Sequence, residues 1–190
     1  MDTELLVRPF ESQADYHGMI DYFHGASDDL LIRMGVDRVK LPPRGEWFDH
    51  AWRDHQRAEE DPQRDRFYLA WVLGGQLVGH SSINQIRWGD RACAHLHLWR
   101  PDLRSVGLGT EFFRRSISLY FDRFNLNTVI VEPHSDNPAP NAVLEKLGFW
   151  LLQRYRTVPG PVNFEQDVNR YEMSRATWNA QLRRLARPLR

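Results

Sequence analysis

Apolar and polar residues alternate in three runs between residues 67 and 99, and the turns Gly74-Gly75 and Gly89-Asp90 separate these runs. Alternation of this kind is typical of strands, and a two-residue glycine turn is typical of a hairpin. We therefore expect three strands in an antiparallel meander. They are Phe67–Leu73, Gln76–Ile86 and Ala92–Trp99.

Upstream of the meander, apolar residues recur at helical spacing and predict a helix over Asp15–His24, with Ser12 placed to cap it. Its apolar face consists of Tyr16, Met19, Ile20 and Phe23. A second helix is predicted over Trp47–Glu59, inside a charged, proline-containing segment at residues 25–66. Such exposed segments often carry substrate contacts. A helix that only covers a sheet fits this pattern equally well.

Downstream of the meander the period changes from two to about four. A helix is predicted from Leu108 to Phe124, and a second from Asn137-Pro138 to about Leu147, where Gly148 ends it. The remaining strands are predicted at Glu4–Pro9, Thr128–Val131, Phe149–Thr157 and Val168–Arg175. This order of elements indicates an α/β domain around a mixed sheet.

Composition excludes several classes of protein. The chain has 190 residues, which favours one domain, and its 25 basic and 25 acidic residues cancel. We therefore expect no nucleic-acid partner. Neither a signal peptide nor a run of 18 apolar residues is present, so we expect a cytoplasmic protein with no membrane partner. We expect a monomer or a homodimer. The single cysteine, Cys93, excludes an intrachain disulfide and a zinc site built on several cysteines.

The most informative stretch is Arg104-Ser105-Val106-Gly107-Leu108-Gly109, between a predicted strand and a predicted helix. Glycines allow a sharp turn, and the free N–H groups of the next helix favour a phosphate, so this loop suits a pyrophosphate. A plain tight connection is the alternative. A P-loop would need a lysine here, and a dinucleotide fingerprint would need a third glycine where the chain has Phe112.

These residues resemble a known family. Arg104-x-x-Gly107-x-Gly109, preceded by a strand and Pro101-Asp102, is similar to the acetyl-CoA pyrophosphate loop of the GNAT N-acetyltransferases. Asn137-x3-Asn141-x2-Leu144-Glu145-Lys146-Leu147-Gly148-Phe149 resembles the family's second motif, most like the branch with ribosomal-protein N-terminal acetyltransferases. The resemblance covers roughly residues 4–175 and implies the GNAT fold, in which two parallel strands, here Ala92–Trp99 and Thr128–Val131, splay apart.

The resemblance implies an acetyl-CoA-dependent transfer of an acetyl group to a primary amine, on a protein N-terminus, an amino acid, a polyamine or an amino sugar. Direct transfer is expected, because Cys93 has no evident activating partner. Acetyl-CoA would be a co-substrate, and no metal is expected. Backbone groups of Leu98, Trp99 and Arg100 would hold the pantetheine and the acetyl carbonyl. The pyrophosphate would be held by N–H groups of the loop, which consists of Arg104, Ser105, Val106, Gly107, Leu108, Gly109 and Thr110. Asn137 and Asn141 would flank the pantetheine arm.

The chain departs from the family at both chemical positions. Many members carry a glutamate as general base near the position of Ala94 in this chain. Many carry a tyrosine as general acid where this chain has Leu144. The first base candidate is His97, followed by His95 and Glu132. The histidines are candidates because imidazole titrates near neutral pH and alternation puts both of them on one face of their strand. Further candidates are His80 and His134 as bases, and Tyr155 or Ser135 as acids.

Alternatives stay open at this point. The pattern also fits histidines with an ordinary structural role, and the two departures from the family also fit a module that binds acetyl-CoA without turnover. His95 and His97, with His80, also resemble part of a cupin metal motif that lacks its downstream partner. We assign residues 1–178 to one domain, with residues 25–66 on the acceptor side. Residues 179–190 form a basic tail, either a flexible end or a helix, that could meet an acidic partner.

Overall fold

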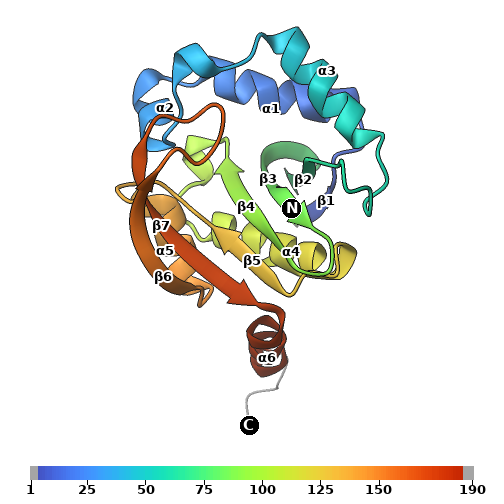
Figure 1. The fold of residues 1–190 in the computed structure, drawn as a ribbon, viewed down its shortest axis with the longest axis vertical. Helices are drawn as coiled ribbons and strands as arrows, with labels where there is room; N and C mark the ends of the chain where they lie inside the picture. Colours follow the sequence, from blue (N-terminus) through green and yellow to red (C-terminus); the bar gives the residue numbers. More distant parts are fainter. Residues whose placement is uncertain (1–3, 186–190) are drawn as a thin grey trace.

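A seven-stranded mixed sheet, ordered β1-β2-β3-β4-β5-β7-β6, organises the protein, whose computed structural model describes residues 4–185 (Figure 1). The strands are β1 (Leu5–Pro9), β2 (Arg66–Leu73), β3 (Gln76–Arg87), β4 (Arg91–Leu98), β5 (Thr128–Val131), β6 (Trp150–Thr157) and β7 (Gln166–Ser174). The helices are α1 (Gln13–Gly25), α2 (Asp28–Arg33), α3 (Arg44–His55), α4 (Leu108–Arg123), α5 (Pro138–Lys146) and α6 (Arg175–Leu185), with short 3-10 turns η1 (Arg38–Lys40) and η2 (Pro101–Leu103).

Each face of the sheet packs against its own helices and has its own core. Helices α4 and α5 cover one face, and α1 to α3 lie over the other (Figure 1). The predicted capping box of α1 is present, since Ser12 Oγ accepts from Asp15 N at 3.3 Å and the Asp15 carboxylate accepts from Ser12 N at 3.2 Å. The predicted apolar face of α1 is buried in the second core. Local periodicity therefore predicted both helical layers.

The parallel strands β4 and β5 separate after a short common stretch. Pairing runs from Arg91 with Thr128 to Ala94 with Val131, whereas β4 continues to Leu98 while still paired with β3. Beyond Ala94 the two strands therefore leave an opening between them. The predicted α/β fold, with splayed parallel strands in a mixed sheet flanked by helices, is confirmed.

The structure differs from the sequence prediction mainly in residues 25–66. Helix α2 and turn η1 were not predicted, because six and three residues are too few to show a period. Helix α3 begins at Arg44 and ends at His55, before the expected Glu59. Part of the stretch assigned to the basic tail is helical, one of the two forms considered. Helix α6 begins before that stretch and packs through Trp178, which is 2% exposed; residues 186–190 lie outside the described residues.

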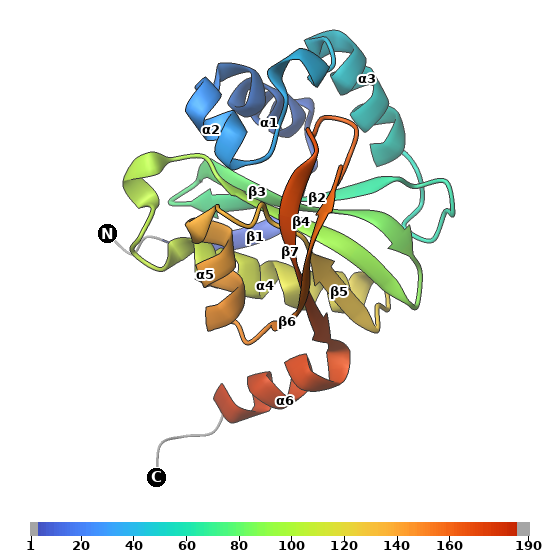
Figure 2. The same ribbon diagram turned by 60° about the vertical axis from the view of Figure 1, so that its left-hand side comes forward.

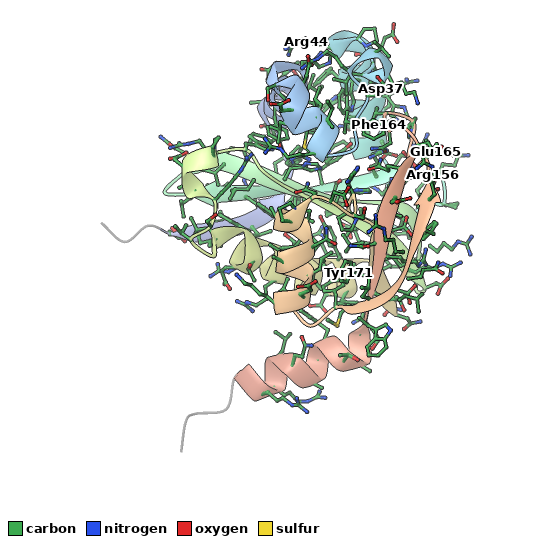
Figure 3. All side chains as sticks on the ribbon, turned by 90° about the vertical axis from the view of Figure 1, so that its left-hand side faces the viewer. Asp37, Arg44, Arg156, Phe164, Glu165 and Tyr171 are labelled. Atoms are coloured by element: carbon green, nitrogen blue, oxygen red, sulfur yellow. The ribbon has the colours of Figure 1, made fainter. Side chains whose placement is uncertain are left out.

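The loop between β6 and β7 reaches across the molecule to the segment after α2 (Figure 2). Asp37 N donates to Val162 O at 2.8 Å, and the buried Gln166 donates from Nε2 to Gly35 O at 3.0 Å. Figure 3 shows Phe164 and Glu165 of this loop close to Asp37. Gly35 has a φ of +71°, and a Cβ there would collide with the Gln166 amide. This contact fixes the loop beside the open ends of β4 and β5. Within residues 4–185, no helix is both long and apolar enough to span a bilayer.

Candidate active site

The glycine loop leads directly into α4 and leaves its first N–H groups free. Gly107 is the N-cap residue with a left-handed φ of +87°, and Glu111 N is the first amide to bond back, to Gly107 O at 3.2 Å. The amides of residues 107–110 therefore have no partner within the helix. A Cβ added at Gly107 or Gly109 would meet no described protein atom within 4 Å. Free donors, the helix dipole and open space together suit an anionic group.

The opening beyond Ala94 exposes one backbone edge of β4. Trp99 N donates to Val78 O at 2.8 Å, so the odd-numbered residues of this strand bond to β3. In an antiparallel pair the bonding direction alternates, so the N–H and C=O groups of Leu96 and Leu98 point the other way. Within the described residues, β5 has ended there and no strand pairs with them. Arg104 Nη2 donates to Leu98 O at 3.1 Å, which links this edge to the glycine loop.

This geometry changes part of the residue assignment on β4. The N–H of Trp99 is used by β3, and its ring packs in the second core, stacked on Tyr22 at 5.8 Å. The Arg100 side chain points to Asp102, at 2.9 and 2.6 Å. Leu96, which the sequence did not single out, has the free N–H instead. Only the register against β3 and the end of β5 reveal this residue.

Three of the four candidate histidines, His80, His95 and His97, gather on the α1 side of the sheet. The rings of His80 and His97 stack at 4.8 Å, Trp99 Nε1 donates to His80 Nδ1 at 2.8 Å, and His95 Nε2 lies 3.1 Å from Asn84 Oδ1. Burial lowers the pKa of His97 to about 4. Burial and the neighbouring Arg66 lower that of His95 to about 3. These imidazoles are therefore neutral at pH 7 and are weak bases.

Within residues 4–185, His97 has no hydrogen-bond partner, so its ring nitrogens are available to water or to a substrate. The alternation expected on β4 is confirmed, since Ala94, Leu96 and Leu98 belong to the opposite core. Cys93 is buried, and burial together with the nearby Glu132 raises its pKa to about 12. A thiol held protonated in this way is a poor nucleophile.

Glu132 lies one residue beyond β5 and joins two side chains from the β6–β7 hairpin. Its Oε1 atom accepts from Tyr155 Oη at 2.6 Å and from Arg170 Nη1 at 2.9 Å. The Glu132 side chain is 13% exposed. Burial and the hydrogen bond to Glu132 raise the pKa of Tyr155, so this phenol keeps its proton at neutral pH. Arg170 also contacts Glu172 at 3.0 Å; spacing along the chain offers no signal for it.

Helix α5 borders the opening from the other side. Asn137 is its N-cap residue, and Asn141 is 8% exposed with its amide fully used inside the protein. Asn141 Nδ2 donates to His134 O and Asn137 O, and its Oδ1 accepts from Asn169. Asn141 therefore ties α5 to β7 and positions Asn137. Leu144 is fully buried, and the Ser135 hydroxyl bonds to Asp136 at 3.1 Å, so neither presents a free proton donor.

The cupin resemblance is not supported. A helix, α4, follows the β4 motif where a cupin would continue in strands. Among the side chains of the described part of the chain, no group of three or more His, Cys, Asp and Glu residues is arranged to hold a metal ion.

Comparison with known proteins agrees with this geometry. A sequence model of the acetyltransferase (GNAT) domain matches residues 4–150. No curated protein sequence matches the chain. The chain is similar in structure to RimL, a ribosomal L7/L12 alpha-N-protein acetyltransferase in complex with coenzyme A. Sequence identity is 15%, the match covers 93% of this chain and 97% of that one, and the TM-score is 0.71.

A spermidine N-acetyltransferase from Vibrio cholerae, in complex with CoA and spermine, matches at 15% identity, covering 92% and 98% of the two chains, with a TM-score of 0.72. A ribosomal-protein-S5-alanine acetyltransferase from Vibrio fischeri matches at 16% identity, covering 92% and 94%, with a TM-score of 0.72. The TM-scores establish a common fold, and two of the three proteins belong to the predicted ribosomal-protein branch. The sequence match covers most of the chain, which therefore belongs to the GNAT family of acetyltransferases, acyltransferases that use acetyl-CoA as co-substrate.

Proposed function

We propose that this protein transfers an acetyl group from acetyl-CoA directly to a primary amine, with both substrates bound together. The main support is the backbone of β4, which continues past its β5 partner and turns the N–H groups of Leu96 and Leu98 into the opening. Fixed N–H donors stabilise the negative charge that develops on a carbonyl oxygen during acyl transfer. The buried, protonated Cys93 supports direct transfer over a covalent route.

The residues present fit acetyl-CoA. Bound there, it supplies an activated acetyl thioester. The amides of residues 107–110 hold the pyrophosphate, with Arg104 beside them, while Ser105 and Val106 shape the loop. Leu98 and Leu96 pair with the pantetheine and the acetyl carbonyl, and Arg100 continues this edge. Asn137, positioned by Asn141, lines the α5 side.

On the acceptor side, His97 accepts the proton of the attacking amine through water, since its ring is neutral and lacks a partner in the described structure. Glu132, held by Arg170 and Tyr155, binds and orients the amine. His95, anchored by Asn84, is two residues before His97 on β4. Tyr155, whose hydroxyl donates to Glu132 at 2.6 Å, is the candidate proton donor.

Residues 1–178 form the catalytic domain in this proposal, and residues 25–66 contribute α2 and α3 to the acceptor side. Their aromatic residues pack mainly within the second core: Trp47, Phe48 and Trp52 all contact it. The acceptor is therefore recognised chiefly by the polar residues of the sheet. The cytoplasmic location, the monomeric or homodimeric state and the absence of a nucleic-acid or membrane partner stay predictions from the sequence.

Two measurements test the proposal together. Calorimetry should show micromolar binding of acetyl-CoA that chelators do not change, and thiol release should show turnover with primary amines. Tight binding without turnover across peptides, amino acids, polyamines and amino sugars would identify a binding module instead. Ala94 and Leu144 are compatible with that outcome, because they replace the residues that many family members use as general base and general acid. Absence of acetyl-CoA binding would contradict the proposal.

A further inference from the structure

A polar groove lies on the acceptor face of the sheet. Its volume of about 530 Å³ is large enough for part of a peptide. Its floor includes Cys93 of β4 and Ile130 of β5, the pair next to the point where the strands separate. Its far wall is formed by the β3–β4 hairpin and by the loop that precedes β2. In Figure 2 this hairpin and the start of α4 lie at opposite ends of the sheet. The groove and the glycine loop therefore approach the opening from opposite directions.

The charge of the groove is strongly positive. Four arginines line it against one carboxylate: Arg64, Arg87, Arg91 and Arg170, with Asp65. Asp65 pairs with Arg66 at 3.3 Å, and Arg66 in turn lies near enough to His95 to lower its pKa. The nearby carboxylates of Glu132 and Glu172 are both bound to Arg170.

Two of the arginines have no carboxylate partner among the described residues, and of these Arg64 is buried whereas Arg87 is exposed. Arg64 donates to the carbonyls of Ala58, Arg66, His55 and Arg57 and, within residues 4–185, to no acidic group. Arg87 is exposed and likewise lacks an ion pair with any described residue. Arg91 reaches Asp90 only at 3.8 Å, on the surface, where such a pair contributes little. The groove thus offers uncompensated positive charge at a distance from the reacting centre.

The distance from the opening to the arginines sets the length of an acceptor that reaches both. Three residues separate Ala94, where the opening begins, from Arg91, and a strand advances about 3.3 Å per residue, so the distance is roughly 10 Å. An extended chain spans at most about 3.3 to 3.6 Å per residue. An acceptor whose amine lies at the opening therefore needs three or four residues to reach Arg91 and Arg87.

We propose that this groove binds the first residues of an acidic peptide, so that the acceptor is a protein N-terminus followed by Asp or Glu. This inference rests on the proposed acetyl transfer and names its acceptor class. Arginine is suited to carboxylates because its planar guanidinium donates two parallel hydrogen bonds. A polyamine would instead place several positive charges against arginines of the same sign.

The weak bases of the site support the same class of acceptor. An α-amino group has a pKa near 7.7 to 8.0, so an appreciable fraction is already neutral at pH 7, whereas a lysine-like amine has a pKa near 10.4. Half-buried imidazoles with depressed pKa values accept a proton weakly, so this site favours an amine that is already largely neutral. The two similar structures, a protein acetyltransferase and a polyamine acetyltransferase, score almost equally, so the groove and not the fold separates these acceptors.

The test uses peptides of six residues that begin with Ser-Ala and carry three glutamates, three glutamines or three arginines, with spermidine as a further acceptor. We expect kcat/KM for the glutamate peptide to exceed that for the arginine peptide about tenfold, because the glutamates pair with the arginines of the groove and the peptide's arginines are repelled by them. The preference should weaken as salt rises. The double variant Arg87→Ala/Arg91→Ala should raise KM for the glutamate peptide about tenfold and leave its kcat unchanged.

A matched control removes two exposed arginines of α6, Arg183→Ala/Arg184→Ala, and should leave KM unchanged. Binding of the glutamate peptide in the presence of CoA is measured by calorimetry, so the inference is decided even without turnover. Equal binding of all three peptides, or a preference for spermidine, would overturn it while acetyl transfer to other amines still upheld the proposed function. Failure of acetyl-CoA binding would instead reject the proposed function, and the peptide titration would still be read on its own.

Discussion

The two ends of the candidate active site offer different kinds of group to a ligand. At the glycine loop the donors are backbone amides of residues 107–110, and no side chain there needs a special identity beyond the glycines. On the acceptor face the functional groups are side chains from β4, β5, β6 and β7, such as His97, Glu132, Tyr155 and Arg170. The first end depends on local conformation, whereas the second depends on long-range register.

This difference separates binding from chemistry and specificity. Backbone amides at a helix start bind any pyrophosphate of suitable shape, so the loop serves one ligand common to a whole family. In the proposed mechanism, side chains on the sheet determine which amine reacts and how fast. The chain also differs from the usual family pattern at Ala94 of β4 and Leu144 of α5. Variants at the two ends should therefore change different quantities, and four experiments test that separation.

The largest effect is expected at His97. In His97→Gln the ring that accepts the proton is lost, and general-base catalysis typically contributes 10²- to 10⁴-fold, so kcat should fall about 100-fold. The Kd for acetyl-CoA should stay unchanged, because the ring is on the acceptor face. Glu132→Gln is the matched comparison and should raise KM for the acceptor more than it lowers kcat. Unchanged turnover of His97→Gln would remove this residue from the mechanism.

Acid should lower the stability of the protein through His97 on the acceptor face. The folded-state pKa of His97 is about 4, below the unfolded value near 6.5, so between these values the unfolded chain binds more protons. The free energy of unfolding should then fall as pH drops from 6.5 to 5, by about 2 kcal/mol for this histidine. Denaturant melts over this range measure the slope. His97→Gln should flatten it, and an equal slope in both proteins would contradict the assignment.

At the other end, Gly107→Ala should weaken acetyl-CoA binding about tenfold. An alanine at a φ of +87° costs roughly 1 to 2 kcal/mol, which favours a loop conformation with misplaced amides. Isothermal titration gives the Kd, and kcat at saturating acetyl-CoA should hardly change. Gly107→Asn, a residue that tolerates this conformation better, should retain more affinity. Equal Kd values for all three proteins would show that the loop does not hold the co-substrate.

The smallest effect is expected for Gly109→Ala, where stability and acetyl-CoA affinity should change in opposite directions. This position lies in the first turn of α4, and the added Cβ meets no described protein atom. Alanine should therefore raise stability by about 0.5 to 1 kcal/mol through helix propensity. If the ligand approaches the backbone there, acetyl-CoA affinity should fall at the same time. A variant that gains both stability and affinity would show that the pyrophosphate lies elsewhere.

Local signals in the sequence were sufficient for most elements and for the position of the glycine loop before α4. The capping box at Ser12, the apolar face of α1, the Gly74-Gly75 hairpin and the stop at Gly148 all involve residues a few positions apart, and all are present. The short α2 and η1 were missed because they are stabilised by tertiary contacts, such as that of Asp37 with Val162, and not by a period of their own.

The sequence by itself determined the family, the two helical layers and the glycine loop, since each follows from neighbouring residues. Only the tertiary structure decided that Leu96 has a free N–H where Trp99 does not, that Glu132 meets Tyr155 and Arg170, and that distant arginines form one groove. The physical reason is that a helix start creates its own donors from consecutive amides. A constellation of side chains exists only after strands far apart in the chain have paired in register.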